Sequence, residues 1–85
     1  GIAFTEQLLG PVLALPQTRG KQLLETVGVF LSAHGDVSRA AERLAIHRNT
    51  ARYRLKQFEE VSGLSLERDF FLLEVAMRVL RVQGY

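Results

Sequence analysis

The spacing of the apolar residues constrains the fold of this chain more than any other feature, because it is helical throughout. The clearest stripe follows the pattern i, i+1, i+4, i+7 and i+8, and consists of Leu23, Leu24, Val27, Phe30 and Leu31. Such a stripe is typical of a helix that packs one face against a core. No segment sustains the apolar–polar alternation of a strand. We therefore expect an all-α fold of about five helices with no sheet.

Turn and capping residues near the N-terminus predict where the first helix lies. Thr5 is a capping residue, so we expect a short helix over residues 6–9 that is interrupted at Gly10-Pro11. Whether helix resumes over residues 12–15 stays open, and Pro16 ends it in either case.

A polar turn over residues 18–20 is expected before the second helix, which runs roughly over residues 21–34. Gly35 is expected to end this helix in the left-handed conformation that glycine adopts at no steric cost. Gly28 lies inside the helix, where glycine costs about 1 kcal/mol relative to alanine. We therefore expect another helix to pack closely at Gly28.

The third helix is short, is capped by Asp36 or Ser38, and ends near Leu44. A three-residue connection leads from it into a fourth helix over residues 48–62, which Gly63 ends. The fifth helix follows, with Ser65 as its cap. It is apolar on more than one side, so it lies in the core or is shared with a partner.

The charge of the chain is concentrated in one segment. The 85 residues carry a net charge of +2. Between Arg39 and Lys56 there are six basic side chains and one acidic side chain, Glu42, which is a net charge of +5. The rest of the chain has five basic and eight acidic groups, a net charge of −3. A basic segment on an otherwise acidic domain indicates a binding site for a polyanion.

Two short helices joined by a tight turn, the second of them basic, predict a helix-turn-helix over residues 36–62. Ala40 and Ala41 are small enough for the second helix to cross the first, and Ile46 is placed to fill the turn. On a helical wheel, Ala51, Leu55 and Phe58 share one face, which we assign to the core. The opposite face is expected to enter the major groove of double-stranded DNA, and it carries Asn49, Arg52, Tyr53 and Lys56.

The side chains of this segment differ in the DNA contact that each can make. Arginine pairs with guanine and asparagine with adenine, so Arg52 and Asn49 are the candidates for base contacts. Phosphate or sugar contacts are expected from the other side chains of this helix, namely Arg48, Thr50, Tyr53 and Lys56. Arg39 and Arg43 are placed to reach the flanking backbone, and His47 caps the helix or touches phosphate.

Three of these assignments have structural alternatives. The alternative for Tyr53 is that it packs its ring on a neighbouring helix, and the alternative for Asn49 is that it is only a solvated first-turn residue. Arg54 lies toward the buried face, so an ion pair with Glu42 or Glu59 competes with DNA contact.

Several runs of residues resemble the C-terminal domain of PucR-type bacterial regulators, a family that includes the purine-catabolism and carbohydrate-diacid regulators. The most specific run is His-Arg-Asn-Thr-x-x-Tyr-Arg at residues 47–54; others are Gly35-Asp36, Ala40-Ala41-Glu42-Arg43-Leu44 and Ser62-Gly63-Leu64-Ser65-Leu66. The similarity extends over residues 8–80, and a broader one, to the Fis-like helix-turn-helix, covers residues 36–58. Asp36 departs from the usual Asn, and Ala51 from a larger apolar residue.

This resemblance implies that residues 1–85 form a single DNA-binding domain at the end of a longer regulator with a sensory part. It also implies a homodimer that binds promoter DNA at two half-sites, with any small-molecule effector bound by a part of the regulator not present here. The alternative is a protein-interaction or dimerisation module that uses the apolar fifth helix, whose side chains include Phe70, Phe71, Leu73, Val75, Met77 and Val79.

Other classes of function lack support in the sequence. The chain has no cysteine, and His34 and His47 have no acidic companion at ligand spacing, so no metal site is expected. No paired carboxylates or glycine-rich phosphate loop indicates an enzyme or a cofactor. With no apolar run of membrane-spanning length and no signal peptide, we expect a cytoplasmic protein.

Overall fold

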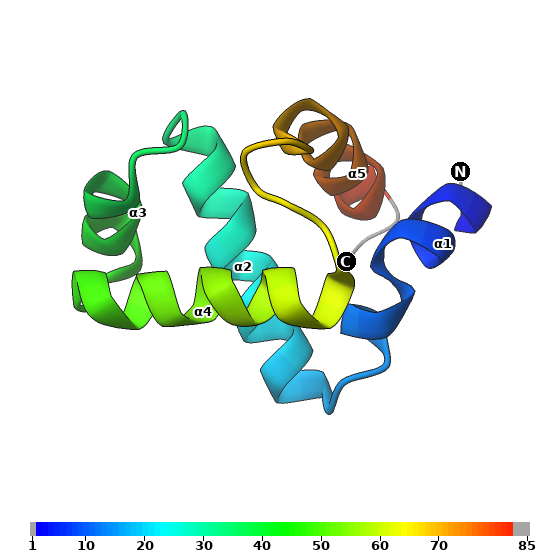
Figure 1. Ribbon diagram of the computed structural model, residues 1–85, viewed down its shortest axis with the longest axis horizontal. Helices are drawn as coiled ribbons and strands as arrows, with labels where there is room; N and C mark the ends of the chain where they lie inside the picture. The colour runs from blue at the N-terminus through cyan, green and yellow to red at the C-terminus, as the bar shows by residue number, and fades with distance from the viewer. Residues whose placement is uncertain (1, 83–85) are drawn as a thin grey trace.

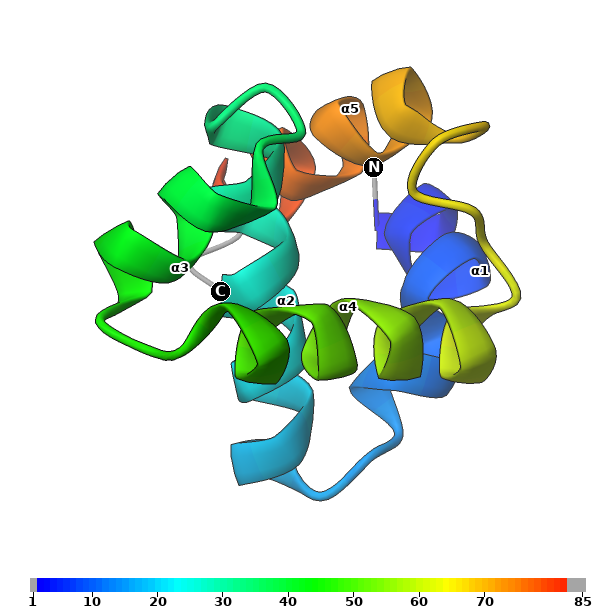
Figure 2. The ribbon, with the colours of Figure 1, turned by 60° about the vertical axis from the view of Figure 1, so that its left-hand side comes forward.

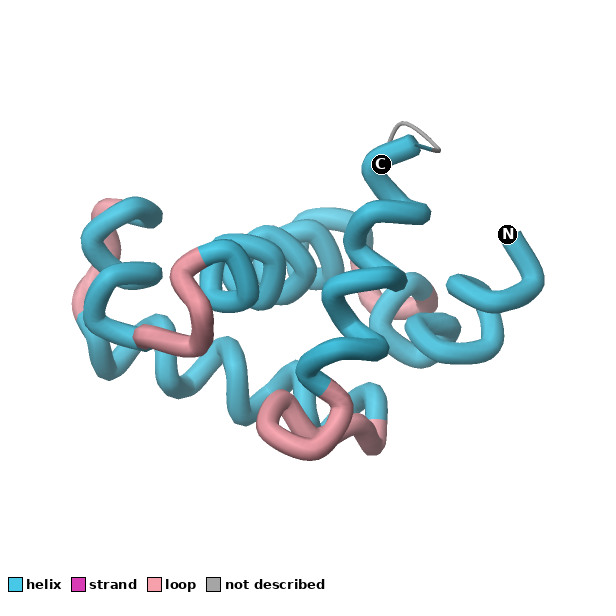
Figure 3. Tube along the Cα trace, turned by 90° about the horizontal axis from the view of Figure 1, so that it is seen from above, coloured by secondary structure: helices cyan, strands magenta, loops and turns pink. Residues whose placement is uncertain are grey.

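The structure is a computed structural model that describes residues 2–82, and every regular element in that range is a helix. The helices are α1 (Ile2–Leu13), α2 (Gln17–Ser32), α3 (Val37–Leu44), α4 (Arg48–Ser62) and α5 (Phe70–Val82). Figure 3 shows short loops between them and no strand in the described range. The predicted all-α fold with a helix-turn-helix as its third and fourth helices is confirmed.

The central helix is α2, which contacts each of the other four helices. Figures 1 and 2 show α4 lying across α2, with α3 at the N-terminal end of α4 and α1 at its C-terminal end. On the other side of the core from α4, α5 packs against α1 and α2.

The core draws large apolar side chains from α1, α2, α4 and α5. Phe58 of α4, Leu9 of α1, Leu23 of α2 and Leu73 of α5 are all fully buried. Burying one such side chain contributes about 1.5–3 kcal/mol to folding. Because Phe58 fixes the inner face of α4 on this core, it also fixes the direction in which the outer face of α4 points.

The first helix is longer than its sequence predicts. Thr5, expected as a cap, lies inside α1 and is buried, and α1 continues through Gly10-Pro11 to Leu13. A proline within a helix removes one backbone hydrogen bond. Here Leu9 and Val12, on either side of the interruption, are fully buried in the core. Their burial keeps this segment helical although Gly10-Pro11 favours an interruption of the helix.

The second helix begins at Gln17, earlier than predicted, so the expected polar turn at residues 18–20 is the first turn of α2. Its end follows the prediction more closely. Regular helix stops at Ser32, two residues before the predicted end, and His34 is the first left-handed residue after it, at φ +57°. Gly35 follows at φ +82°, and its N–H donates to the carbonyl of Phe30 at 3.0 Å. This hydrogen bond satisfies one of the last carbonyls of the helix.

The close approach between helices occurs at Gly20 and not at Gly28. A Cβ placed on Gly20 would lie 3.0 Å from the backbone oxygen of Val12 in α1. A Cβ on Gly28 would meet nothing within 4 Å, because Gly28 lines a shallow groove between α2 and α5. The expected helix packing at Gly28 is therefore wrong, and it is Gly20 that lets α1 and α2 meet.

Replacing each of these two glycines of α2 by alanine should have opposite effects on the stability of the domain. Gly28→Ala should stabilise the domain by about 0.5–1 kcal/mol, because alanine favours helix and the site is open. Gly20→Ala should lose that gain or destabilise the domain, because the added methyl group would press on the backbone carbonyl of Val12. Urea denaturation of the two variants measures this difference. Equal stabilisation by both would contradict the close contact at Gly20.

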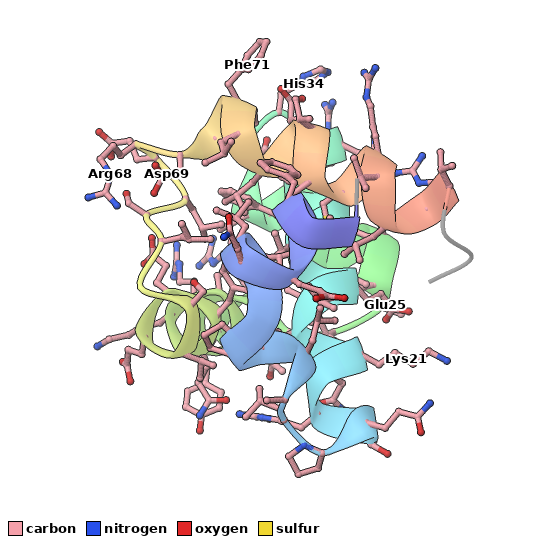
Figure 4. The ribbon with its side chains drawn as sticks, turned by 90° about the vertical axis from the view of Figure 1, so that its right-hand side faces the viewer. Lys21, Glu25, His34, Arg68, Asp69 and Phe71 are labelled. Carbon is pink, nitrogen blue, oxygen red and sulfur yellow. The ribbon has the colours of Figure 1, made fainter. Side chains whose placement is uncertain are left out.

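The turn before α5 is held by hydrogen bonds between Ser65, Arg68 and Asp69. The Ser65 hydroxyl accepts from the Arg68 N–H at 3.0 Å, and the Ser65 N–H donates to the Asp69 carboxylate at 2.9 Å. Arg68 also forms an ion pair with Asp69 at 2.9 Å, seen side by side in Figure 4. Ser65 thus caps the turn over residues 66–69 and not α5 itself, which begins at Phe70, so the predicted cap of the fifth helix is wrong. The hydrogen bond from Arg68, aided by that from Ser65, lowers the pKa of Asp69.

A lowered pKa in the folded state makes stability depend on pH in one direction. The contribution of Asp69 is complete above the pKa of an unfolded aspartate, about 3.9, and is lost as pH falls through the folded value. Asp69→Asn should therefore flatten the acid side of the stability curve. Thermal unfolding of both proteins between neutral and strongly acidic pH measures this. An unchanged acid slope in the variant would show that Asp69 does not contribute to it.

Candidate DNA-binding interface

The first helix of the motif begins and packs as the sequence indicates. Asp36, and not Ser38, is the cap of α3: its carboxylate accepts a hydrogen bond from the Arg39 N–H at 3.1 Å. Ala40 and Ala41 are buried, and α3 packs on both α4 and α2. These two small side chains allow the helices to approach, as predicted.

The turn between the helices combines a left-handed residue with a histidine cap. Ala45 ends α3 with φ +56°, and Ile46 is half-buried in the turn. The Nδ1 atom of His47 accepts a hydrogen bond from the Asn49 N–H at 3.0 Å. His47 is therefore the cap of α4, which satisfies one of the amides left free at a helix start.

The two faces of α4 separate as the helical wheel predicts. Ala51, Leu55 and Phe58 are buried, at no more than 6% exposure. Along the opposite side, the side chains of Asn49, Arg52, Tyr53 and Lys56 are exposed.

All nine residues predicted to contact DNA are exposed. They are Arg39, Arg43, His47, Arg48, Asn49, Thr50, Arg52, Tyr53 and Lys56. The single ion pair in the described range joins Arg68 to Asp69, outside this set. The basic side chains of the set therefore carry charges that no carboxylate of the described chain neutralises. Arg43 has a local partner of another kind, since its Nη1 donates to the hydroxyl of Ser32 in α2 at 3.3 Å.

The structural ion pair considered for Arg54 is not formed. Arg54 is half-buried, and neither Glu42 nor Glu59 lies within ion-pair distance of it. Glu59 instead accepts a hydrogen bond from the Leu66 N–H at 2.8 Å and so ties α4 to the following loop.

One residue beside this face was not identified from the sequence. The guanidinium of Arg19, in the first turn of α2, lies 5.7 Å from the centroid of the Tyr53 ring. The Tyr53 side chain stays 55% exposed, so its neighbour on α2 is a cation and not an apolar pocket. Nothing in the local sequence pattern could indicate Arg19, because the contact joins two helices that are distant in sequence.

Among the described residues, no group of three or more histidine, cysteine, aspartate or glutamate side chains is arranged to hold a metal ion. No helix within residues 2–82 has the length and apolar character needed to cross a membrane.

Comparison with known proteins agrees with this geometry. The family model of the PucR C-terminal helix-turn-helix domain matches residues 23–79. The chain is 40% identical over 72 residues to the purine catabolism regulatory protein of Bacillus subtilis, which is 82% of this chain and 14% of that protein. It is 40% identical over 65 residues to the proline-responsive transcriptional activator PutR of the same organism, which is 76% of this chain and 16% of that protein. No solved structure matches the chain significantly.

The family match spans the helix-turn-helix and the helices that support it. It begins in α2, covers α3 and α4 completely, and ends within α5. The chain itself covers only about a seventh of the curated regulators that it matches. On this evidence the chain belongs to the PucR C-terminal helix-turn-helix domain family of transcription regulators.

Proposed function

We propose that this chain is the sequence-specific DNA-binding output domain of a longer bacterial transcription regulator, with α4 lying in the major groove of promoter DNA. The observation that carries the proposal is the outer face of α4. Polar and basic side chains are exposed there, their cations pair with no carboxylate within residues 2–82, and a buried stripe holds the opposite face on the core. A recognition helix requires this division of faces.

Within this proposal the exposed side chains have different tasks. Arg52 and Asn49 lie on the outer face of the first two turns, where a recognition helix meets base edges. Contacts to phosphate or sugar are made by Arg48, Thr50, Tyr53 and Lys56, and by Arg39 and Arg43 of α3. The His47 ring uses Nδ1 for the helix cap, so any phosphate contact is made through its other ring nitrogen.

The function so proposed is binding alone, without catalysis, cofactor or metal, and it operates in the cytoplasm. Since the related regulators are about seven times longer than the matched region, we place the recognition of any small-molecule effector in a part of the regulator outside this chain.

Arg52→Ala tests the assignment of the reading face. The variant should lose about 1–3 kcal/mol of affinity at the cognate site and accept more bases at the position that Arg52 contacts. The measurement is fluorescence anisotropy with a duplex selected from a random pool by the unaltered chain. The control is Arg81→Ala, which removes an exposed arginine from α5 and should leave affinity unchanged.

Two results would contradict this proposal at different levels. If Arg52→Ala binds the selected duplex as tightly as the unaltered chain, α4 is turned differently in the groove. If the unaltered chain binds no duplex even at low salt, where phosphate contacts are strongest, the DNA-binding function itself is wrong.

We further propose that the regulator binds DNA as a homodimer and that α5 contributes to the contact between the two copies. Of the apolar side chains noted in α5, Leu73 and Met77 are buried, and Phe70 packs edge-on against Phe30. The apolar surface that α5 turns away from the core is therefore smaller than the sequence indicated. Phe71, 78% exposed, projects away from the molecule in Figure 4.

The remaining outward residues of α5 have the spacing of a two-helix seam. Leu72, Val75, Val79 and Val82 follow each other at intervals of three, four and three residues, and none of them is fully buried. This is the a/d spacing of a coiled coil, which a second copy of the same helix can match across a two-fold axis. Because α4 lies across the core from α5, such a pairing leaves both reading faces free (Figure 1).

Val75→Lys tests the pairing through α5. It places a charge in the centre of the seam, at a side chain that is already 42% exposed, so folding should be preserved. In sedimentation velocity the unaltered chain should shift toward a dimer as concentration rises, whereas the variant should remain a monomer with the same circular dichroism spectrum. A monomer at every concentration of the unaltered chain would refute this contact while leaving the DNA-binding proposal standing.

A further inference from the structure

Arg19 and Tyr53 form a contact between two helices at the edge of the reading face. Arg19 is the third residue of α2, and Tyr53 lies in the second turn of α4. The guanidinium carbon lies 5.7 Å from the ring centroid, within the range of a cation–π interaction. Tyr53 is exposed and Arg19 half-buried, so the pair is at the surface and open to a ligand.

The contact orients Arg19 without neutralising its charge. No carboxylate pairs with Arg19 in the part of the chain that the structure describes. An arginine held against an aromatic ring keeps its charge and its N–H donors, whose fork geometry matches a phosphate. An exposed cation–π contact is weak, but it is enough to restrict a long side chain. Arg19 is thus a restrained cation whose donors remain available.

The position of Arg19 relative to α4 indicates which part of DNA it meets. A helix with its side chains is about 10–12 Å wide and the major groove is about 12 Å wide, so a helix in the groove fills it from edge to edge. A group held beside the helix therefore faces the sugar–phosphate backbone and not a base edge. Figure 1 shows the first turns of α2 emerging beside α4, away from the end where α3 lies.

We propose that Arg19 is a phosphate-contacting residue of the DNA interface, outside the helix-turn-helix motif, and that Tyr53 is the positioning residue that aims it. The inference rests on the proposed function. It extends the proposed DNA-binding surface from α3 and α4 onto α2, beside the second turn of α4. Arg19 binds phosphate through its N–H donors, which arginine can present in pairs to a phosphate group.

The salt dependence of binding to the selected duplex tests this inference. Arg19→Ala should reduce the slope of log affinity against log salt by about 0.9, the contribution of one neutralised phosphate. It should weaken binding to the selected duplex and to a random-sequence duplex by the same factor, because a phosphate contact carries no sequence information. Arg19→Lys should retain most of the slope, because it keeps the charge.

Lys21→Ala is the matched control. Lys21 lies two residues from Arg19 on the same helix, carries the same charge, and projects on the side of α2 turned away from α4 (Figure 4). Its removal should leave the slope unchanged. If Arg19→Ala behaves like Lys21→Ala, or if it lowers only the thermal stability of the free chain, then Arg19 serves only the packing of α2 on α4 and the inference is overturned.

A double-mutant cycle tests the role given to Tyr53. The loss of DNA affinity caused by Arg19→Ala should be smaller in a Tyr53→Leu background, because the ring that orients the guanidinium is absent there. The same loss should be unchanged in a Tyr53→Phe background, because the ring remains. Additive losses in the Tyr53→Leu background would refute the positioning role. If the unaltered chain binds no duplex, the proposed function fails, an outcome distinct from failure of the inference alone.

Discussion

The interaction on which the rest of this structure depends is the packing of α4 against α2. Ala51, Leu55 and Phe58 place one face of α4 on the core, and α2 supports it from the centre of the molecule. A core of this size has little redundancy, because a domain of fewer than a hundred residues buries a modest share of its surface. The direction of the outer face of α4 therefore follows from a few apolar contacts on the inner face.

The parts of the fold that the sequence predicted are those with local signals. Asp36, Gly35 and Gly63 set helix ends through hydrogen bonds or backbone angles that involve only nearby residues. The helical wheel of α4 separated buried from exposed side chains correctly because that helix is regular and packs on one side. These local signals were enough to predict α3, α4 and the exposure of all nine candidate residues.

The parts that the sequence did not predict depend on contacts between distant segments. Leu9 and Val12 keep α1 helical through Gly10-Pro11, and only the assembled core supplies the energy for this. Gly20 is required because the backbone of α1 lies close to it, and no pattern within α2 can reveal this contact. For the same reason Arg19 was missed at the site: its neighbour Tyr53 belongs to another helix, and only the fold brings them together.

The central position of α2 has a consequence for how a signal from the rest of a regulator could act on this domain. Since α2 touches every other helix, a shift of any one helix disturbs its packing on α2. Interiors packed in this way have discrete arrangements and do not deform gradually. In the homodimer proposed above, a signal would therefore act most easily by moving each domain as a whole and changing its distance and angle to the second copy, while the outer face of α4 stays unchanged.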